Sequence, residues 1–302
     1  MSHARIIVNP VAGAGRTARE WPRIMSLFKG QGLNFEHDIT EAPGHAVELA
    51  RDATKNGYET IISVGGDGTL NEIANGLYKA GASKDIALGM VCTGTGSDYA
   101  RTVGVSRQYE EACMRIFQPK IITVDLGIIE YAENGSSVER VFVNFAGMGF
   151  DAEIVRRTTR NFKALGSTLS YLMGVFTTLV SYRNRKVTLI IDGGEEEREV
   201  CSVIANNGRY GGGGMFTAPD ADLTDGLFDL LIIGDIGKAD LIRSLPRIYK
   251  GTHLTHPKVT MKKAREIEVK STYPLSLQAD GELLGELPAR FRVLPSALNI
   301  IV

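Results

Sequence analysis

The sequence of 302 residues has few cysteines and no excess of charge of either sign. Its three cysteines, Cys92, Cys113 and Cys201, lie far apart and form no CxxC pair, so neither a disulfide framework nor a zinc site is indicated. Lys and Arg number 34 and Asp and Glu 35, which gives a formal net charge of -1. Because a general nucleic-acid-binding protein normally carries a basic excess, nucleic acid is not expected as a partner.

Long apolar runs are also missing. The longest candidate, residues 169–181, falls well short of the ~20 apolar residues that a membrane-spanning helix needs. A buried helix is favoured for it, and a helix that lines a lipid pocket or lies on a membrane surface is the alternative. The first residues, MSHARIIVNP, lack the charged start and apolar stretch of a signal peptide, so a cytoplasmic protein is expected.

The first 125 residues or so alternate strand and helix patterns. Short apolar, β-branched segments at 5–8, 34–39, 60–64 and 86–91 predict strands, and apolar residues recur between them at helical spacing. This βαβ rhythm predicts a doubly wound α/β domain, in which helices cover both faces of a parallel sheet. In such sheets ligands bind at the carboxyl ends of the strands.

After residue 125 the pattern becomes mainly strand and turn. Candidate strands occupy 138–144, 186–192, 199–206, 228–234, 258–261, 266–270, 275–278 and 289–293. They predict a mainly antiparallel β domain with a few inserted helices. The expected division is therefore an α/β domain over 1–124 and a β-rich domain over 125–295. Whether residues 296–302 return to the first domain stays open.

The strongest local motif is GGDGTLNE at 65–72, between a predicted strand and a predicted helix. Adjacent glycines let the backbone approach a phosphate closely, and the N–H groups that open the next helix favour an anion. An acidic side chain would repel phosphate, so Asp67 is best explained by a cation bound beside it. A plain turn capped by Asp67 is the weaker alternative.

Two further Gly-rich turns follow strands and should reach the same sheet edge. One is NPVAGAGR at 9–16 and the other begins GTGSD at 94–98. The second turn also offers a cap for the helix after it. Ser97 is the residue that could supply this cap.

Together these motifs resemble a known family. GGDGTLNE is similar to a motif shared by diacylglycerol kinases, sphingosine kinases, NAD kinases and phosphofructokinases, and NPVAGAGR with GTGSDYAR narrows the resemblance to the diacylglycerol kinase catalytic family and its soluble bacterial lipid kinases. Ser97 stands where many relatives have asparagine. The resemblance implies ATP contacts from Asn9, Gly13, Gly15, Arg16, Thr40, Gly65, Gly66, Asp67, Gly68, Thr69, Leu70, Asn71 and Thr95.

The resemblance also implies roles for residues in the second half. Asp280-Gly281-Glu282 matches a motif whose glutamate is the general base, although turn chemistry alone would favour a hairpin there. Residues 222–227 match a structural magnesium loop, with ligands from the Asp225 carboxylate and from the carbonyls of Asp222 and Leu227. Asp125 matches a carboxylate that links the magnesium sites. Asp67 and Asp280 would supply oxygen ligands to a Mg²⁺ ion on the ATP phosphates.

The resemblance implies an ATP-dependent lipid kinase that uses Mg²⁺, with ATP bound by residues 1–124, the lipid substrate and magnesium held by 125–295, and the reaction in a cleft between these domains. Diacylglycerol, converted to phosphatidic acid, is the first substrate expected, and phosphatidylglycerol, a sphingoid base or another lipid alcohol stays open. It would meet its lipid by transient contact with the inner face of the membrane. The alternatives are a small-molecule kinase similar to NAD kinases and a nucleotide- or lipid-binding regulator without catalysis. The oligomeric state is open, and a homodimer is one outcome.

Overall fold

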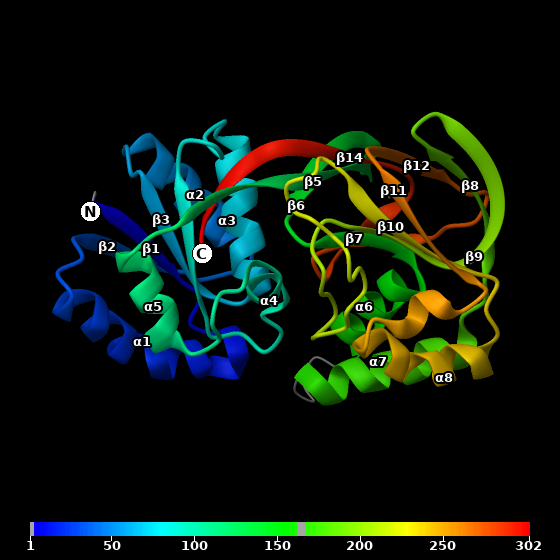
Figure 1. The fold of residues 1–302 in the computed structure, drawn as a ribbon, viewed down its shortest axis with the longest axis horizontal. Coiled ribbons are helices and arrows are strands. Elements are labelled where there is room, and N and C mark those ends of the chain that lie inside the picture. The colour runs from blue at the N-terminus through cyan, green and yellow to red at the C-terminus, as the bar shows by residue number, and fades with distance from the viewer. Residues whose placement is uncertain (1–2, 162–166) are drawn as a thin grey trace. The chain divides into compact units, whose positions relative to one another are not determined.

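The computed structural model describes residues 3–161 and 167–302 (Figure 1). The chain folds into two compact units, Met1–Leu126 with Pro295–Val302 as unit 1, and Gly127–Leu294 as unit 2. It passes from one unit to the other within two strands, β5 (Ile121–Glu133) and β14 (Glu282–Ile301).

Unit 1 contains a parallel sheet with the strand order β2-β1-β3-β4. Its strands are β1 (Ala4–Val8), β2 (Phe35–Ile39), β3 (Thr60–Gly65) and β4 (Ala87–Cys92). The end of β14 adds a further parallel strand, with Asn299 opposite Ala87 and Ile300 opposite Leu88. The last residues of the chain therefore do return to the first unit.

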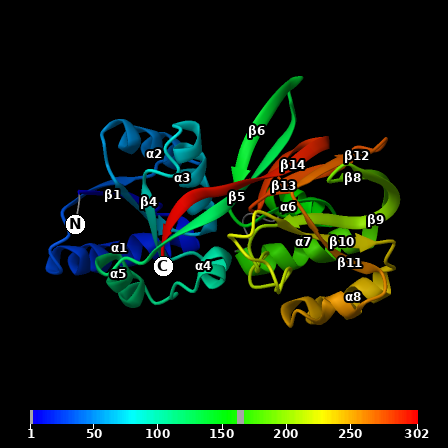
Figure 2. The ribbon, with the colours of Figure 1, turned by 45° about the horizontal axis from the view of Figure 1, so that its top comes forward.

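Helices cover both faces of this sheet, as the doubly wound pattern predicts. Figures 1 and 2 show α2 (His45–Lys55) and α3 (Asp67–Lys79) on one face and α1 (Ala12–Gly30) and α5 (Tyr109–Phe117) on the other, and α4 (Asp98–Val103) follows β4. The helices α2 and α3 pack closely because small residues meet. A Cβ on Gly76 of α3 would lie 2.5 Å from the carbonyl oxygen of Val47 and 2.7 Å from Ala50 Cβ.

Unit 2 is built on antiparallel strands in the order β11-β10-β9-β7-β13-β14, and β8 pairs with both β9 and β12. The strands are β6 (Ser136–Phe142), β7 (Phe145–Gly149), β8 (Arg185–Ile191), β9 (Gly194–Asn206), β10 (Phe228–Gly234), β11 (Val259–Ala264), β12 (Glu266–Lys270) and β13 (Ser276–Ala279). Its core includes Phe142 stacked on Phe228 with ring centroids 5.5 Å apart.

The α/β unit and the mainly antiparallel unit together confirm the predicted fold class. The sequence does not predict β7, because three of its five residues, FAGMG, are Ala or Gly, which are depleted in strands. Gly147 has no side chain where a helix approaches closely. A Cβ on Gly147 would lie 2.4 Å from Asp151 Oδ2 at the start of α6 (Phe150–Asn161).

The predicted helix at 169–181 lies within α7 (Ser167–Ser181). The side chains of residues 169–173 lie outside the described part of the chain. Beyond them, Leu179 is buried against Phe150 and Ile154 of α6, whereas Phe176 and Val180 are each 61% exposed. The remaining helix of unit 2 is α8 (Lys238–Tyr249), which a short 3₁₀ turn, Thr252–Thr255, follows. Among the described residues, none of the helices combines the length and the apolar character needed to cross a bilayer.

Candidate active site

The three Gly-rich turns of unit 1 meet at the carboxyl ends of β1, β3 and β4. They enclose a hollow of about 300 Å³ whose lining residues are Asn9, Ala12, Gly13, Gly66, Asp67, Gly68, Thr69, Glu72, Gly94, Thr95 and Gly96. The expectation that these turns gather on one sheet edge is therefore confirmed. Five of the eleven lining residues are glycines, which present only main-chain atoms to the hollow.

The turns can meet only because particular positions are glycine. A Cβ on Gly94 would lie 2.6 Å from Gly66 Cα, so the second and third turns touch backbone to backbone. In the first turn, Gly13 has φ +60°, and a Cβ there would lie 2.2 Å from the carbonyl oxygen of Thr93. Any side chain at these positions would push the turns apart.

Asn9 ties the first turn to the second. Its Nδ2 donates to Thr69 Oγ1 at 3.0 Å, and its Oδ1 accepts from the Val11 N–H at 3.2 Å. Thr69 lies in the first turn of α3, whose N-cap residue Gly66 has no side chain to cap the helix. Backbone N–H groups thus open α3 at the wall of the hollow, which is an arrangement that favours phosphate.

Asp67 lines the hollow and also holds the third turn in place. Its Oδ2 accepts from the Asp98 N–H and its Oδ1 from the Tyr99 N–H, both at 3.1 Å. Asp67 therefore caps α4. The prediction that Ser97 caps this helix is wrong: Ser97 has φ 53° and makes no capping hydrogen bond, because its left-handed backbone turns the hydroxyl toward the Gly94 carbonyl instead.

Six of the predicted ATP contacts do not line the hollow. These are Gly15, Arg16, Thr40, Gly65, Leu70 and Asn71. Arg16 pairs with Glu20 one turn along α1, at 2.7 Å, and Leu70 and Asn71 are buried within unit 1. Glu72 was not among the predicted contacts but does line the hollow, where its carboxylate accepts from the Ala46 N–H at 3.1 Å and so anchors the start of α2.

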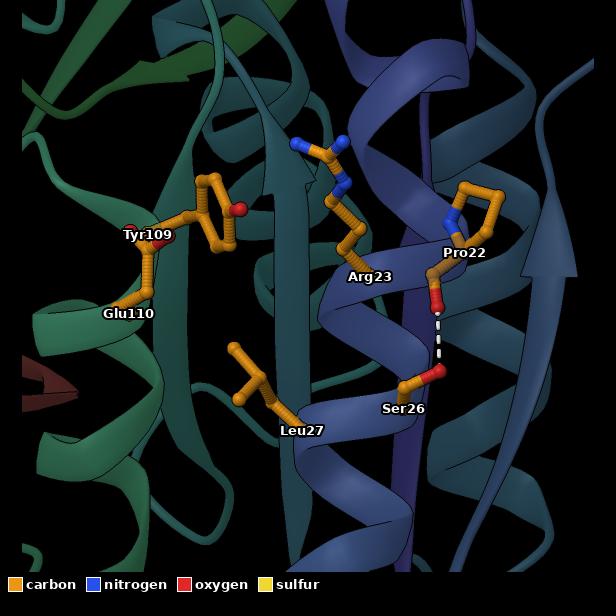
Figure 3. Close-up of a pocket in the computed structure, with 6 residues that line it drawn as sticks. All are labelled: Pro22, Arg23, Ser26, Leu27, Tyr109 and Glu110. Carbon is orange, nitrogen blue, oxygen red and sulfur yellow. Dashed lines mark hydrogen bonds between the residues drawn. The ribbon is translucent and has the colours of Figure 1, made fainter.

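A second hollow in unit 1 is larger, about 460 Å³, and lies between α1 and α5 (Figure 3). Pro22, Arg23, Ser26 and Leu27 of α1 and Tyr109 and Glu110 of α5 line it. It contains none of the Gly-rich turns, and the Ser26 hydroxyl is occupied by the Pro22 carbonyl of its own helix. The smaller hollow is therefore the better candidate for nucleotide chemistry.

In unit 2, the motif Asp280-Gly281-Glu282 forms the hairpin turn between β13 and β14, in which Ala279 pairs with Glu282. Asp280 has φ 47° and Gly281 φ 81°, the left-handed pair that a tight two-residue hairpin requires. Turn chemistry and the family motif thus describe the same three residues. The turn places Glu282 at the first position of β14.

Asp280 is bound to the backbone of the segment that joins β6 to β7. Its Oδ2 accepts from the Val143 N–H at 2.7 Å, and its Oδ1 accepts from the N–H groups of Asn144 and Phe145 at 3.0 and 2.9 Å. Hydrogen bonds to an ionised acceptor are the strong kind. The Asp280 carboxylate therefore fixes the hairpin turn to the β6–β7 connection.

A buried chain of side chains holds the other side of the turn. Gln278 Oε1 accepts from the Gly281 N–H at 3.0 Å, and Gln278 Nε2 donates to Asp151 Oδ2 at 2.9 Å. The Ser202 hydroxyl donates to the other oxygen of Asp151. Burial raises the pKa of the Asp151 carboxyl. Sequence reasoning missed Asp151 and Gln278. The only local signal is that Gln278 lies two positions before the DGE motif.

Glu282 is paired with Arg140 of β6, whose Nη2 donates to Glu282 Oε2. The Glu282 side chain is 39% exposed, so solvent or a ligand can reach the carboxylate while the guanidinium holds its orientation. Arg140 was not predicted. It lies 142 residues before Glu282, and no local motif marks it.

The 222–227 loop has its carboxylates already engaged. Asp225 Oδ1 accepts from the Leu227 N–H at 3.0 Å, and Asp225 Oδ2 accepts from Lys263 Nζ at 2.9 Å. Burial opposes the charge of Lys263, but hydrogen bonds from its ammonium to Asp229 and Asp225 raise its pKa, so it is positive at neutral pH.

Mg²⁺ prefers near-octahedral oxygen ligation at about 2.0–2.1 Å. Over residues 3–161 and 167–302, no group of three or more His, Cys, Asp or Glu side chains has an arrangement that could hold a metal ion. The Asp225 carboxylate, which is the side-chain ligand that the resemblance implies in the 222–227 loop, is already paired with an ammonium, and the metal-ligand role of the loop stays a prediction.

Asp125, which the resemblance connects with magnesium, is buried in β5 where the chain leaves unit 1. Its Oδ1 accepts from the Ser296 N–H at 2.7 Å, and Ser296 has φ 49°. This bond fixes β5 to the last segment of β14. The ligand role predicted for Asp125 stays a prediction.

Comparisons with known proteins identify the families that each half of the chain resembles. Residues 3–129 match the family model "Diacylglycerol kinase catalytic domain", and residues 144–302 match "YegS C-terminal NAD kinase beta sandwich-like domain". The chain is 29% identical to the diacylglycerol kinase of Bacillus subtilis (strain 168) over 100% of its own length and 97% of the relative's. It is also 29% identical to the diacylglycerol kinase of Staphylococcus carnosus (strain TM300), over 98% of its own length and 94% of the relative's. A crystal structure from Bacillus anthracis (strain Sterne) matches its fold with a TM-score of 0.81 at 24% identity, covering 99% and 95%.

Proposed function

This chain belongs to the diacylglycerol kinase family, and from that premise we propose that it phosphorylates diacylglycerol to phosphatidic acid with ATP as donor. Membership makes the chain a kinase of a lipid kinase family. The choice of diacylglycerol rests on the names of the relatives. These are diacylglycerol kinases, and this chain matches them over nearly their whole length.

The observation that carries the proposal is the hollow formed by the three Gly-rich turns. Its wall offers backbone N–H groups and the hydroxyls of Thr69 and Thr95, which suit the oxygens of a nucleotide polyphosphate. ATP enters such sites as its Mg²⁺ complex, and Asp67 and Glu72 are the two carboxylates of the GGDGTLNE motif that line the hollow. Preorganised donors around the transferred group are the main source of catalysis in phosphoryl transfer.

The proposed base is Glu282. During transfer a bond forms between the lipid oxygen and the γ-phosphorus, the bond from that phosphorus to ADP breaks, and the hydroxyl proton passes to the Glu282 carboxylate. Arg140 keeps the carboxylate in one orientation, and the Asp280 and Gln278 bonds keep the hairpin turn beneath it rigid. Pre-positioned acceptors of this kind increase the rate because less reorganisation precedes the reaction.

The lipid substrate sets where the enzyme must work. Diacylglycerol resides in a bilayer, so we propose a peripheral and transient contact between the protein and the membrane surface. Homodimer formation stays a prediction that does not enter the reaction.

The test is transfer of labelled γ-phosphate from ATP to lipids in mixed micelles. The panel contains diacylglycerol, phosphatidylglycerol and a sphingoid base, with NAD in a parallel tube, and each reaction is run with Mg²⁺ and with EDTA. We expect labelled phosphatidic acid only with Mg²⁺. Labelled NAD without a lipid product would instead identify a small-molecule kinase, and ATP binding without any product would identify a regulator.

The same assay tests the base. Glu282→Gln should lower the turnover number by about 10²–10⁴-fold, the range typical of general base catalysis. Glu286→Gln provides the matched control, since it removes an exposed carboxylate from the same strand. Turnover in Glu282→Gln equal to that of the control would exclude Glu282 as the base.

A further inference from the structure

The 222–227 loop and the strand after it carry several carboxylates, and a positive charge beside them would stabilise the fold. Asp225, Asp229 and Asp222 bring three carboxylates into one turn and the strand that follows it. Asp229 is almost fully buried, with a side chain 4% exposed. Asp222 and Asp225 are exposed on the turn, whereas the buried Asp229 carboxylate is costly unless a positive charge lies beside it.

The strand pairing supplies this positive charge from within the chain. In the antiparallel ladder between β10 and β11, Lys263 lies directly opposite Asp229. Its Nζ donates to Asp229 Oδ2 at 2.7 Å and to Asp225 Oδ2 at 2.9 Å, so one ammonium bridges both carboxylates. The ladder fixes the position of the Lys263 backbone, and the bridge follows from it.

Two further polar groups at the loop also bond to protein atoms. Asp222 Oδ1 accepts from the N–H and the hydroxyl of Thr224 at 2.9 and 2.7 Å. The carbonyl of Ala221 accepts from Arg209 Nε at 2.9 Å, which brings a second positive charge to the loop. Lys263 and Arg209 therefore bring two positive charges of this chain to the turn and its three carboxylates.

We propose that Lys263 is the built-in cation of the 222–227 loop, and that its ammonium takes the place that the family resemblance gives to a structural Mg²⁺. The loop then forms without a divalent ion. If the proposed kinase reaction is correct, the Mg²⁺ requirement of the enzyme comes from the nucleotide alone. EDTA should then stop turnover without loosening the fold.

The experiment measures stability and metal content rather than activity, so its result is independent of whether the proposed reaction is correct. Wild type, Lys263→Met and Lys262→Met are purified without nucleotide, and their thermal midpoints are measured in EDTA and in Mg²⁺. Lys262 is the matched control because it is the neighbouring residue, its side chain is 38% exposed against 40% for Lys263, and it pairs with Glu196 instead. Bound magnesium in the wild type is measured by elemental analysis.

We expect the wild-type midpoint to be the same in EDTA and in Mg²⁺, with no stoichiometric magnesium. Lys263→Met should melt about 5 °C lower than Lys262→Met in EDTA, because it leaves a buried carboxylate unpaired, and Mg²⁺ should restore part of the loss. The proposal is overturned if the wild type melts lower in EDTA or retains about one equivalent of magnesium. It is equally overturned if Lys263→Met matches its control, or if Mg²⁺ restores nothing. Should Lys263→Met fail to fold, the two wild-type measurements still decide the question.

Discussion

The candidate site of unit 1 depends on main-chain atoms, whereas that of unit 2 depends on side chains. In unit 1, glycine turns at one sheet edge bring backbone to backbone, and five of the eleven residues that line the hollow are glycines. In unit 2, side chains distant in the sequence hold a hairpin turn: Asp280 binds N–H groups 135 to 137 residues away, and Arg140 pairs with Glu282. The first site depends on the absence of side chains and the second on their presence.

This difference predicts how each site fails. A backbone-built site is damaged by added atoms, because a Cβ separates turns that must touch. A site built by side chains is damaged by removed atoms, because each deletion leaves a buried donor or acceptor without a partner. Substitutions in the two units should therefore differ in which property they change first, nucleotide affinity in unit 1 and stability of the turn in unit 2.

The largest effect is expected from Asp280→Ala. The substitution leaves three backbone N–H groups without their acceptor and puts an alanine at φ 47°, so we expect a loss of about 2–4 kcal/mol in the free energy of unfolding and no measurable turnover. Chemical denaturation and the lipid phosphorylation assay measure the two effects. ATP affinity should stay near that of the wild type, since the hollow of unit 1 is untouched.

Asp192→Ala provides an internal control for that result. Asp192 forms an equivalent Asp-Gly turn between β8 and β9 with φ 46°, and its carboxylate accepts from the Arg265 and Glu266 N–H groups. It is exposed and lies far along the chain from the DGE motif, so we expect a loss of about 1 kcal/mol and full turnover. Equal loss of activity in both variants would show that the Asp280 bonds do not serve the site specifically.

An intermediate effect is expected from Gly13→Ala in unit 1. Both Gly13 and Gly15 have positive φ, but a Cβ on Gly13 meets the Thr93 carbonyl at 2.2 Å, whereas on Gly15 its nearest neighbour is Arg19 Nη1 at 3.7 Å. Gly15→Ala thus adds backbone strain alone, about 1 kcal/mol, and Gly13→Ala adds a clash with a turn of the hollow. Titration calorimetry should show ATP binding weakened by roughly 10–100-fold in Gly13→Ala and by less than about 5-fold in Gly15→Ala.

If instead the two alanines weaken ATP binding equally, the cause is strain in the first turn and not the contact between turns. The comparison of the two units would then lose its main support, because the hollow would not depend on close approach of the backbone.

The same contrast explains what the sequence could reveal. The Gly-rich turns and the strands before them are contiguous motifs, so their convergence on one sheet edge follows from the parallel topology. The DGE hairpin is also local, since Asp-Gly alone predicts its turn. The partners of the turn are not local. Val143 reaches it beside the antiparallel pairing of β7 with β13, Asp151 through α6, and Arg140 through β6, which β5 joins to β14. No periodicity in the sequence specifies these contacts.

Ser97 and Lys263 show the limit of reasoning from residue types. Serine is a good helix cap, yet at Ser97 the left-handed backbone turns the hydroxyl away and Asp67 caps the helix from 31 residues earlier. In the sequence, nothing distinguishes Lys263 from the other basic residues near it. Its partner becomes clear only from the antiparallel pairing of β10 with β11, which places it opposite Asp229. In both cases the fold decides which of several chemically adequate residues performs the task.

Apart from the control variants, the smallest effect is expected from Gln278→Met, which tests whether the buried hydrogen-bonded side chains behind the hairpin turn serve catalysis. The substitution keeps a similar volume but removes the acceptor of the Gly281 N–H and the donor to Asp151. We expect a loss of about 1–2 kcal/mol in stability and a turnover number reduced about 10-fold, with the KM for ATP unchanged. Gln31→Met, at an exposed helix end of unit 1, is the control for the loss of a glutamine. If Gln278→Met is less stable but turns over at the wild-type rate, the buried side chains behind the turn serve folding alone. A raised KM for ATP would show that the two sites are not independent, which would contradict the comparison of the two units.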